Sequence, residues 1–319
     1  MKDIAASIDL GSHTARLLIA QRSESSPWGW IPLLRRRAYI RLAADCGPEG
    51  DGQIGPGAAA RAVDALRAFS RLIADYSVSQ VHAVATGIIR DAIDGDRFLT
   101  RLYEATGIPI ELISGEKEAL LSGMGARAGL NIHGDSLVFD LGGGTTEFLR
   151  HMGGEIKGVS LSLGAAVLTR RFIRSDPPAA DDLDAISREV ERRLKTVAAN
   201  ISGAPWVVGT GGSVATLAAM IHGIAGDDIR PERLNGLIVT LPELEACLAQ
   251  IHILTTAERV GRLGLDPGRA DVIVAGSLAI VGILRFLGKS ELMVSLSDLL
   301  EGLLIEDSGI EEFRNYELI

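Results

Sequence analysis

The chain has 319 residues, of which 47% are hydrophobic and only 4% aromatic, and it carries a net charge of −9 with a pI near 5.3. This length exceeds what one hydrophobic core usually serves, so two domains are expected. The acidic balance argues against a nonspecific nucleic-acid binder or a membrane-surface protein, because both carry a basic face. We therefore expect neither nucleic acid nor membrane as a partner.

Three further features predict a cytoplasmic protein. The N-terminus runs directly into a predicted strand, without the charged segment and apolar segment that direct secretion. Cys46 and Cys247 lie far apart and show no metal-ligand spacing, which suits a reducing compartment. The longest apolar stretch, residues 272–284, is too short to span a bilayer and is expected to form a buried helix.

The first predicted element is a hairpin at residues 7–20, SIDLGSHTARLLIA, in which Asp-Leu-Gly separates two apolar stretches. Residues 27–57 are expected to be irregular, with the basic triplet 35–37 at a solvated strand end or, less favoured, along the path of a polyanion. Strands and helices then alternate. The predicted elements are a helix at 63–76, a strand at 81–86, a helix at 91–105, a strand at 108–114 and a helix at 116–127.

A second hairpin at residues 137–150, LVFDLGGGTTEFLR, repeats the first, and its Asp140 stands 131 positions after Asp9. This repetition predicts an α/β protein with duplicated halves, each opened by a hairpin. The remaining predicted elements are a strand and helix within 158–172, a capped helix at 183–201, a strand, turn and helix within 206–220, a helix at 269–287, a strand at 293–297 and a last helix.

Three glycine-rich turns follow buried strands and are predicted to bind phosphate. Glycine lets backbone N–H groups approach phosphate oxygens without a Cβ in the way. A single turn of this kind is usually structural, but three of them, two matched in sequence, favour a phosphate site. The predicted phosphate-binding residues are Gly11, Ser12, His13 and Thr14 in the first turn, Gly142, Gly143, Gly144 and Thr145 in the second, and Gly211, Gly212 and Ser213 in the third.

Acidic residues beside the first two turns predict a metal site. A lone aspartate at a strand end usually caps a turn. Asp9 and Asp140, as a matched pair beside phosphate turns, suit Mg²⁺, which takes one or two carboxylates together with phosphate oxygens and water. Glu147 is predicted to join this shell directly or through water.

Hydrolysis of a phosphoanhydride also needs an ordered water and a group that takes its proton. Glu116 and Glu118, at the start of the helix before the second hairpin, are the candidates, although either alone is typical of a solvated first helical turn. Arg90 follows a buried strand and is a candidate for neutralising a terminal phosphate. The alternative for Arg90 is an ion pair with Asp91 or Asp94.

The motifs DLGSHT, ATGIIRDA, ISGEKEA, FDLGGGTTE and GTGGSVATLA, in this order, resemble the exopolyphosphatase/guanosine pentaphosphate phosphatase (Ppx/GppA) family in its short, two-domain form. The resemblance covers nearly the whole chain and places it in the actin, Hsp70 and sugar-kinase superfamily. It implies two ribonuclease-H-like (actin-like ATPase) α/β domains with mixed sheets flanked by helices and an interdomain cleft. The implied domains are residues 1–124, rejoined by the last helix at 299–319, and residues 125–298.

The resemblance also implies an activity and roles for the candidate residues. The expected enzyme is a Mg²⁺-dependent, homodimeric hydrolase that removes terminal phosphate from inorganic polyphosphate or from the 5′ end of guanosine pentaphosphate. Glu118 would be the catalytic base, and Arg90 would contact the terminal phosphates. Asp140 and Glu147 would hold Mg²⁺, with Asp9 nearby.

Three positions depart from the family pattern. His13 stands where asparagine is usual, Gly87 where serine is frequent, and Leu300 where arginine is usual. The departures bear on substrate choice more than on chemistry, since the proposed base and metal ligands remain. Two alternatives stay open: a non-catalytic alarmone or nucleotide sensor, favoured by the departures, and a small-metabolite kinase on the same fold, for which no sugar-binding insertion is visible.

Overall fold

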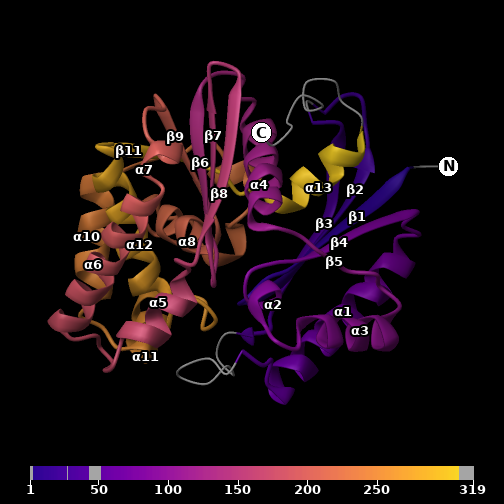
Figure 1. Cartoon of the computed structure of the whole chain (residues 1–319), viewed down its shortest axis with the longest axis horizontal. Helices are drawn as coiled ribbons and strands as arrows, with labels where there is room; N and C mark the ends of the chain where they lie inside the picture. The colour runs from indigo at the N-terminus through magenta and orange to yellow at the C-terminus, as the bar shows by residue number, and fades with distance from the viewer. Residues whose placement is uncertain (1–2, 27, 43–51, 309–319) are drawn as a thin grey trace.

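The computed structural model describes residues 3–26, 28–42 and 52–308. It contains two mixed sheets, one in each half of the chain, with helices on their outer faces and two helices between them (Figure 1). Cys46 and residues 309–319, the end of the segment predicted to rejoin the first domain, lie outside the described residues. Within the described ranges, no helix is long and apolar enough to cross a membrane.

The first sheet combines an antiparallel meander with two parallel strands. Strands β1, β2 and β3 form the meander, and β4 and β5 continue the sheet in the direction of β1, giving the order β3-β2-β1-β4-β5. Helices α1 and α3 pack together and bury a core against this sheet (Figure 1). The bounds are β1 Ile4–Leu10, β2 Thr14–Arg22, β3 Trp30–Tyr39, α1 Pro56–Asp75, β4 Gln80–Ala85, α2 Ile88–Asp91, α3 Gly95–Thr106 and β5 Glu111–Leu112.

The second sheet repeats this topology. Its order is β10-β11-β9-β6-β7-β8, so the β6-β7-β8 meander corresponds to β1-β2-β3, and β9 and β11 correspond to β4 and β5. The outer helices bury a large aliphatic core against it. The bounds are β6 Ser136–Leu141, β7 Thr146–Met152, β8 Glu155–Leu161, α5 Ala165–Phe172, α6 Ala180–Thr196, α7 Ala198–Ile201, β9 Trp206–Thr210, α8 Gly212–Ile221, α9 Pro231–Leu234, β10 Ile238–Thr240, α10 Leu241–Ile251, α11 Thr256–Leu263, α12 Ile273–Leu287 and β11 Glu291–Val294.

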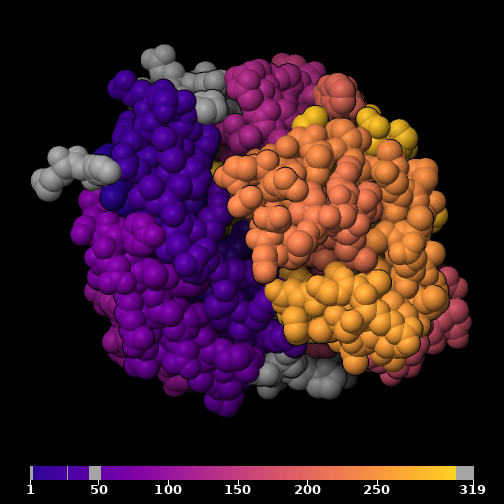
Figure 2. Space-filling view, turned by 180° about the vertical axis from the view of Figure 1, so that it is seen from behind, coloured from indigo at the N-terminus to yellow at the C-terminus, as the bar shows by residue number. Residues whose placement is uncertain are grey.

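Helices α4 (Gly115–Leu130) and α13 (Leu299–Ser308) cross between the two sheets. Helix α4 packs on β6, β7 and β8, while α13 packs on α4, β1 and β2. The crossing is close because glycine stands at the contact on both helices: a Cβ on Gly125 would lie 1.9 Å from the Asp298 carbonyl oxygen, and one on Gly302 would lie 2.0 Å from that of Leu121. The predicted boundary between residues 124 and 125 falls within α4. Figure 2 shows the two halves meeting along a seam.

The prediction of an irregular segment at 27–57 is wrong in part, because β3 occupies Trp30–Tyr39. The strand pairs with β2 along its length, and a bulge beside Pro32 accommodates the proline at the sheet edge. The basic triplet therefore lies within a strand rather than at its end. The helix predicted at 91–105 begins only at Gly95, as α3, because Asp91 ends the short helix α2. The helix predicted at 183–201 is broken into α6 and α7.

Candidate active site

The three predicted phosphate turns meet at one cavity between the two sheets. The β1–β2 turn, the β6–β7 turn and the start of α8 line this cavity, together with the first turn of α4. The structure thus brings together most of the predicted site from both halves of the chain. The predicted residues that line the cavity are Asp9, Gly11, Ser12, His13, Thr14, Glu118, Asp140, Gly142, Gly143, Gly144, Thr145, Glu147, Gly211 and Gly212.

Two predicted site residues lie outside the cavity lining. Ser213 is buried under the first turn of α8, where its hydroxyl lies against Gly276 of α12. Arg90 lies behind the cavity and donates from Nη1 to Glu118 Oε2 at 3.1 Å and to the Ile113 carbonyl at 3.2 Å. Neither bond is to Asp91 or Asp94, the partners that the sequence had suggested as an alternative.

The two hairpin turns have the same backbone geometry and touch one another. The N–H of Gly11 donates to the Thr14 carbonyl at 3.0 Å, and the N–H of Gly142 donates to the Thr145 carbonyl at the same distance. A Cβ on Gly144 would lie 2.3 Å from the Ser12 hydroxyl. The glycines of the second turn therefore let the first turn approach, which puts both sets of backbone N–H groups at one cavity.

Four carboxylates surround the cavity and are almost completely buried. The exposed fractions are 5% for Asp9, 7% for Glu118, 9% for Asp140 and 3% for Glu147. Burial and the neighbouring Asp9 raise the pKa of Glu118 to about 7. Burial and Asp298 raise the pKa of Asp140 to about 7, and burial with Glu118 and Asp140 raises that of Glu147 well above its ordinary value. Such a cluster gains stability from a bound cation.

Each carboxylate has a different partner. Asp9 accepts two bonds from Arg16, Asp140 accepts the Ser122 hydroxyl at 3.0 Å, and Glu147 accepts the Ser160 hydroxyl at 2.7 Å. Glu116 and Glu118, the two candidates for the catalytic base, differ in burial. Glu118 points into the cavity lining, whereas Glu116 is exposed to solvent.

The donor set fits a magnesium ion that the substrate helps to bind. In the part of the chain that is described, no group of three or more His, Cys, Asp or Glu side chains could hold a metal. Mg²⁺ does not require such a group, because it is usually held by one or two carboxylates plus phosphate oxygens and water. Asp140 and Glu147 are register partners on β6 and β7, and Asp9 Oδ1 is buried with no hydrogen-bond partner among the described residues. These oxygens are suitable ligands.

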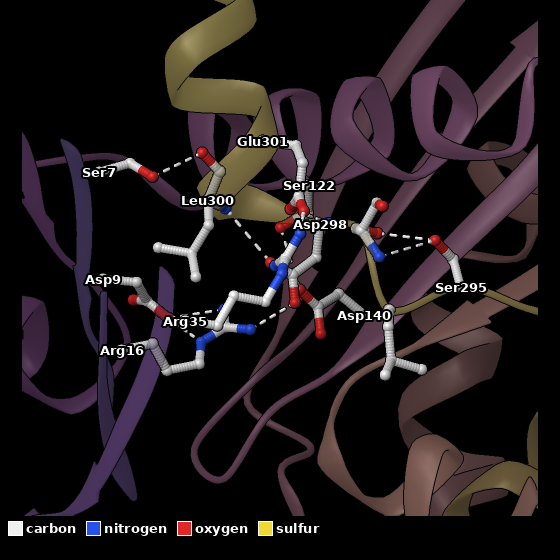
Figure 3. Close-up of polar contacts among 12 residues, drawn as sticks. Ser7, Asp9, Arg16, Arg35, Ser122, Asp140, Ser295, Asp298, Leu300 and Glu301 are labelled. Carbon is white, nitrogen blue, oxygen red and sulfur yellow. Dashed lines mark hydrogen bonds and ion pairs between the residues drawn. The ribbon is translucent and has the colours of Figure 1, made fainter. Parts of the chain in front are cut away.

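Three charged residues of the site were not predicted from sequence. Arg16 lies between Asp9 and Asp298, donating to Asp9 at 2.9 and 2.7 Å and also to Asp298 (Figure 3). Arg269 lines the cavity and packs its guanidinium against Gly212, and its buried Nε has no hydrogen-bond partner within the described ranges. One signal could have revealed Arg16: it occupies the position in the first hairpin that Glu147 occupies in the second.

His13 joins the two halves across the cleft. Its Nε2 donates to the Gly268 carbonyl at 2.8 Å, and its ring meets Tyr39 edge-on. Burial lowers the pKa of His13, which keeps the ring neutral near pH 7. Two ion pairs support the same contact: Arg37 with Asp266 at 3.0 Å and Arg41 with Asp271 at 3.3 Å.

The other two departures have structural explanations. Gly87 has a φ of +53°, and a Cβ there would lie 2.6 Å from the Ser12 hydroxyl, so a larger residue would be strained. Leu300 is buried in the core between the sheets, and its carbonyl accepts the Ser7 hydroxyl at 2.7 Å. The neighbouring Glu301 is paired instead with Arg35 of β3.

Comparisons with known proteins agree with this architecture. The model of the Ppx/GppA phosphatase family matches residues 18–310. Exopolyphosphatase 2 of Mycobacterium tuberculosis is 31% identical over 321 residues, covering 95% of this chain and 98% of that protein. The crystal structure of the Aquifex aeolicus Ppx/GppA member matches with a TM-score of 0.79 and 28% identity over 96% of this chain and 98% of that one. An exopolyphosphatase from Cytophaga hutchinsonii matches with a TM-score of 0.84 and 26% identity over 97% and 99% of the two chains.

These matches confirm the predicted fold class, with two mixed sheets flanked by helices in the actin-like arrangement. They span nearly the full length of the chain and of its relatives. The protein therefore belongs to the Ppx/GppA phosphatase family.

Proposed function

We propose that the protein is a Mg²⁺-dependent phosphohydrolase that removes the terminal phosphate of a linear phosphoanhydride chain. Its substrate is inorganic polyphosphate or the 5′ end of guanosine pentaphosphate. One observation carries the proposal: a buried glutamate with a pKa raised to about 7 lines the same cavity as three glycine-rich turns. The chain's membership of the Ppx/GppA family and its similarity to an exopolyphosphatase support the proposal.

The binding of substrate uses the turns and the cleft arginines. Backbone N–H groups of the two hairpin turns and of the α8 N-terminus bind phosphate oxygens, which they can approach because of the glycines. Arg16 and Arg269 line the cavity and provide positive charge. The guanidinium of Arg269, which lines the cavity, is suited to bind phosphate oxygens.

Glu118 performs the proton transfer. It accepts a proton from the attacking water, which it orients in line with the terminal phosphorus. Arg90 bonds to one carboxylate oxygen of Glu118 at 3.1 Å, so it fixes the orientation of the base and stabilises its charged form. We therefore extend the predicted role of Arg90 from phosphate contact to control of the base.

Asp140 and Glu147 are the proposed ligands of Mg²⁺, with Asp9 Oδ1 as a further oxygen donor. The bound ion would neutralise charge on the phosphate oxygens. The serine hydroxyls that donate to Asp140 and Glu147 hold these carboxylates in fixed orientations before substrate arrives. The cytoplasmic location and the homodimer stay predictions.

The decisive experiment measures phosphate release by the purified protein on long polyphosphate, tripolyphosphate, guanosine pentaphosphate and ATP, each with Mg²⁺ and with EDTA. We expect phosphate from polyphosphate or guanosine pentaphosphate in Mg²⁺ and none in EDTA. Binding of guanosine pentaphosphate by calorimetry without phosphate release would identify a sensor. Transfer of phosphate from ATP to a sugar in a sugar panel would identify a kinase.

A further inference from the structure

A buried ion pair lies behind the cavity, outside its lining. Arg35, in the middle of β3, donates from Nη2 to Glu301 Oε1 on α13 (Figure 3). The Glu301 side chain is 0% exposed, and that of Arg35 is 29% exposed. Removing a buried charge from water is costly, so a pair of this kind is weak evidence for stability alone. The proposed chemistry does not use either residue.

A continuous series of contacts joins this pair to the cavity. The second oxygen of Glu301 accepts the backbone N–H of Asp298 at 2.9 Å. The Asp298 carboxylate accepts the N–H of Leu300 at 3.2 Å and a guanidinium N–H of Arg16. Asp298 is therefore fixed both by its backbone and by its side chain, and Arg35 anchors this arrangement from the neighbouring sheet.

Arg16 is the only member of this series that lines the cavity, among the described residues. Asp9 accepts hydrogen bonds from Nε and Nη2 of Arg16, and Asp298 accepts one from Nη1. The guanidinium carries more N–H donors than these contacts use, so donors remain for a phosphate oxygen. Without Asp298, Nη1 of Arg16 would lose its fixed partner, and Asp9 alone would hold the guanidinium.

We propose that Arg35 is a positioning residue for substrate binding. It fixes Glu301, Glu301 fixes Asp298, and Asp298 holds Arg16 in the orientation that binds substrate phosphate. The proposal rests on the proposed function for the class of substrate. It assigns a role to Arg35 of the basic triplet, for which the sequence had suggested either a solvated strand end or the path of a polyanion.

The test is a double-mutant cycle that uses tripolyphosphate as the probe. Dissociation constants are measured by calorimetry in a Glu118→Gln background, so that the probe is not consumed, for Arg35→Gln, Arg16→Gln and the double variant. We expect Arg35→Gln to weaken binding about tenfold, within the range for residues that orient a site. If Arg35 acts through Arg16, the double variant binds no more weakly than Arg16→Gln alone. With Glu118 intact, Arg35→Gln raises KM and leaves kcat nearly unchanged.

Arg36→Gln is the matched control, because Arg36 is exposed on the same strand and its guanidinium donates to the Arg35 carbonyl rather than to Glu301. Arg36→Gln should bind tripolyphosphate as the parent does. If Arg35→Gln fails to fold because it leaves a lone buried charge, Arg35→Lys is used, since it keeps the charge and loses the planar fork. We expect Arg35→Lys to fold and to weaken binding less than tenfold but measurably.

The proposal is overturned if a folded Arg35 variant binds tripolyphosphate like the parent, or if the double variant shows the product of the two single effects. A structural role alone predicts that product, since the two defects would then act independently. A coupled loss of binding in a protein that hydrolyses none of the substrates would refute the proposed function and leave this inference standing.

Discussion

The two hairpins that line the cleft share one backbone design and carry opposite charges at one matched position. In the first hairpin, Asp9 is paired in register with Arg16, whereas in the second Asp140 is paired with Glu147. The first hairpin thus pairs its acid with a cation, whereas the second pairs its acid with another acid. Burial raises the pKa of both acids in the second hairpin, with Asp298 adding to the effect on Asp140 and Glu118 adding to that on Glu147. In the proposed function, the first hairpin offers an arginine to phosphate and the second offers carboxylates to Mg²⁺.

This difference teaches how a duplicated motif acquires two roles. Both turns keep the glycines that admit phosphate, and a single side chain on the second strand of each hairpin sets the local charge. Substrate phosphates and Mg²⁺ need opposite charges at adjacent places. The division predicts that changes in the second hairpin act on metal binding and catalysis, while changes in the first act on affinity for phosphate.

We expect the largest effect from substitution of Glu118, the proposed catalytic base. Glu118→Gln removes the proton acceptor, and we expect the turnover number to fall about a thousandfold, within the range for loss of a general base. Tripolyphosphate binding should persist, because the turns are intact. Phosphate release and calorimetry measure the two effects, and Glu116→Gln is the control, since Glu116 is exposed. Near-normal turnover of Glu118→Gln would exclude it as the base.

Substitutions at the matched position, Arg16 in the first hairpin and Glu147 in the second, test the two proposed roles separately. Glu147→Gln should raise the Mg²⁺ concentration needed for half-maximal activity about ten- to hundredfold, as expected for a lost ligand contact. Arg16→Gln should raise the KM for tripolyphosphate and leave the Mg²⁺ requirement unchanged. Steady-state kinetics with Mg²⁺ and substrate varied separately measures both. If the two variants change the same parameter, the division of roles between the hairpins is wrong.

The pH dependence of kcat/KM tests the proposed role of Glu118 and the effects of Arg90 and Asp9 on its pKa. The pKa of Glu118 is raised to about 7, and a base must be deprotonated to act, so kcat/KM should rise with pH through about 7. Arg90 lowers this pKa and Asp9 raises it. Arg90→Gln should therefore move the acid limb to higher pH, and Asp9→Asn should move it to lower pH. Profiles at saturating Mg²⁺ test this, and shifts of both variants in one direction would contradict it.

Sequence could predict the parts of the site that lie within one local motif. Asp9 stands beside the first glycine turn, and Asp140 and Glu147 stand on either side of the second. The repeated topology of the two sheets follows from the repeated hairpin. Of the three missed residues, Arg16 lies within the first hairpin, where its match with Glu147 was the overlooked signal. The other two depend on contacts between distant segments. Arg269 and Asp298 reach the cleft from loops of the second half, and β3 was hidden because its arginines and proline do not show the alternation of an ordinary strand.

Arg90 shows a related limit of sequence-based prediction, because its partner could not be read from its position in the chain. Its place after a buried strand indicated a residue near the site, but its bond to Glu118 joins residues 28 positions apart and follows from no local pattern. Side-chain partners of this kind are decided by tertiary structure. They were therefore not available from spacing alone.

The smallest effect is expected at His13, which ties the first hairpin to the second half of the chain. Its bond to the Gly268 carbonyl joins the two sides of the cleft, and one net hydrogen bond contributes about 1 kcal/mol. His13→Ala removes that bond, so we expect KM for tripolyphosphate to rise about fivefold, with little change in kcat. His252→Ala, on the outer face near α10, is the matched control. A fall in kcat as large as that of Glu118→Gln would show that the first hairpin takes part in the chemical step, against the division of roles drawn from the two matched positions.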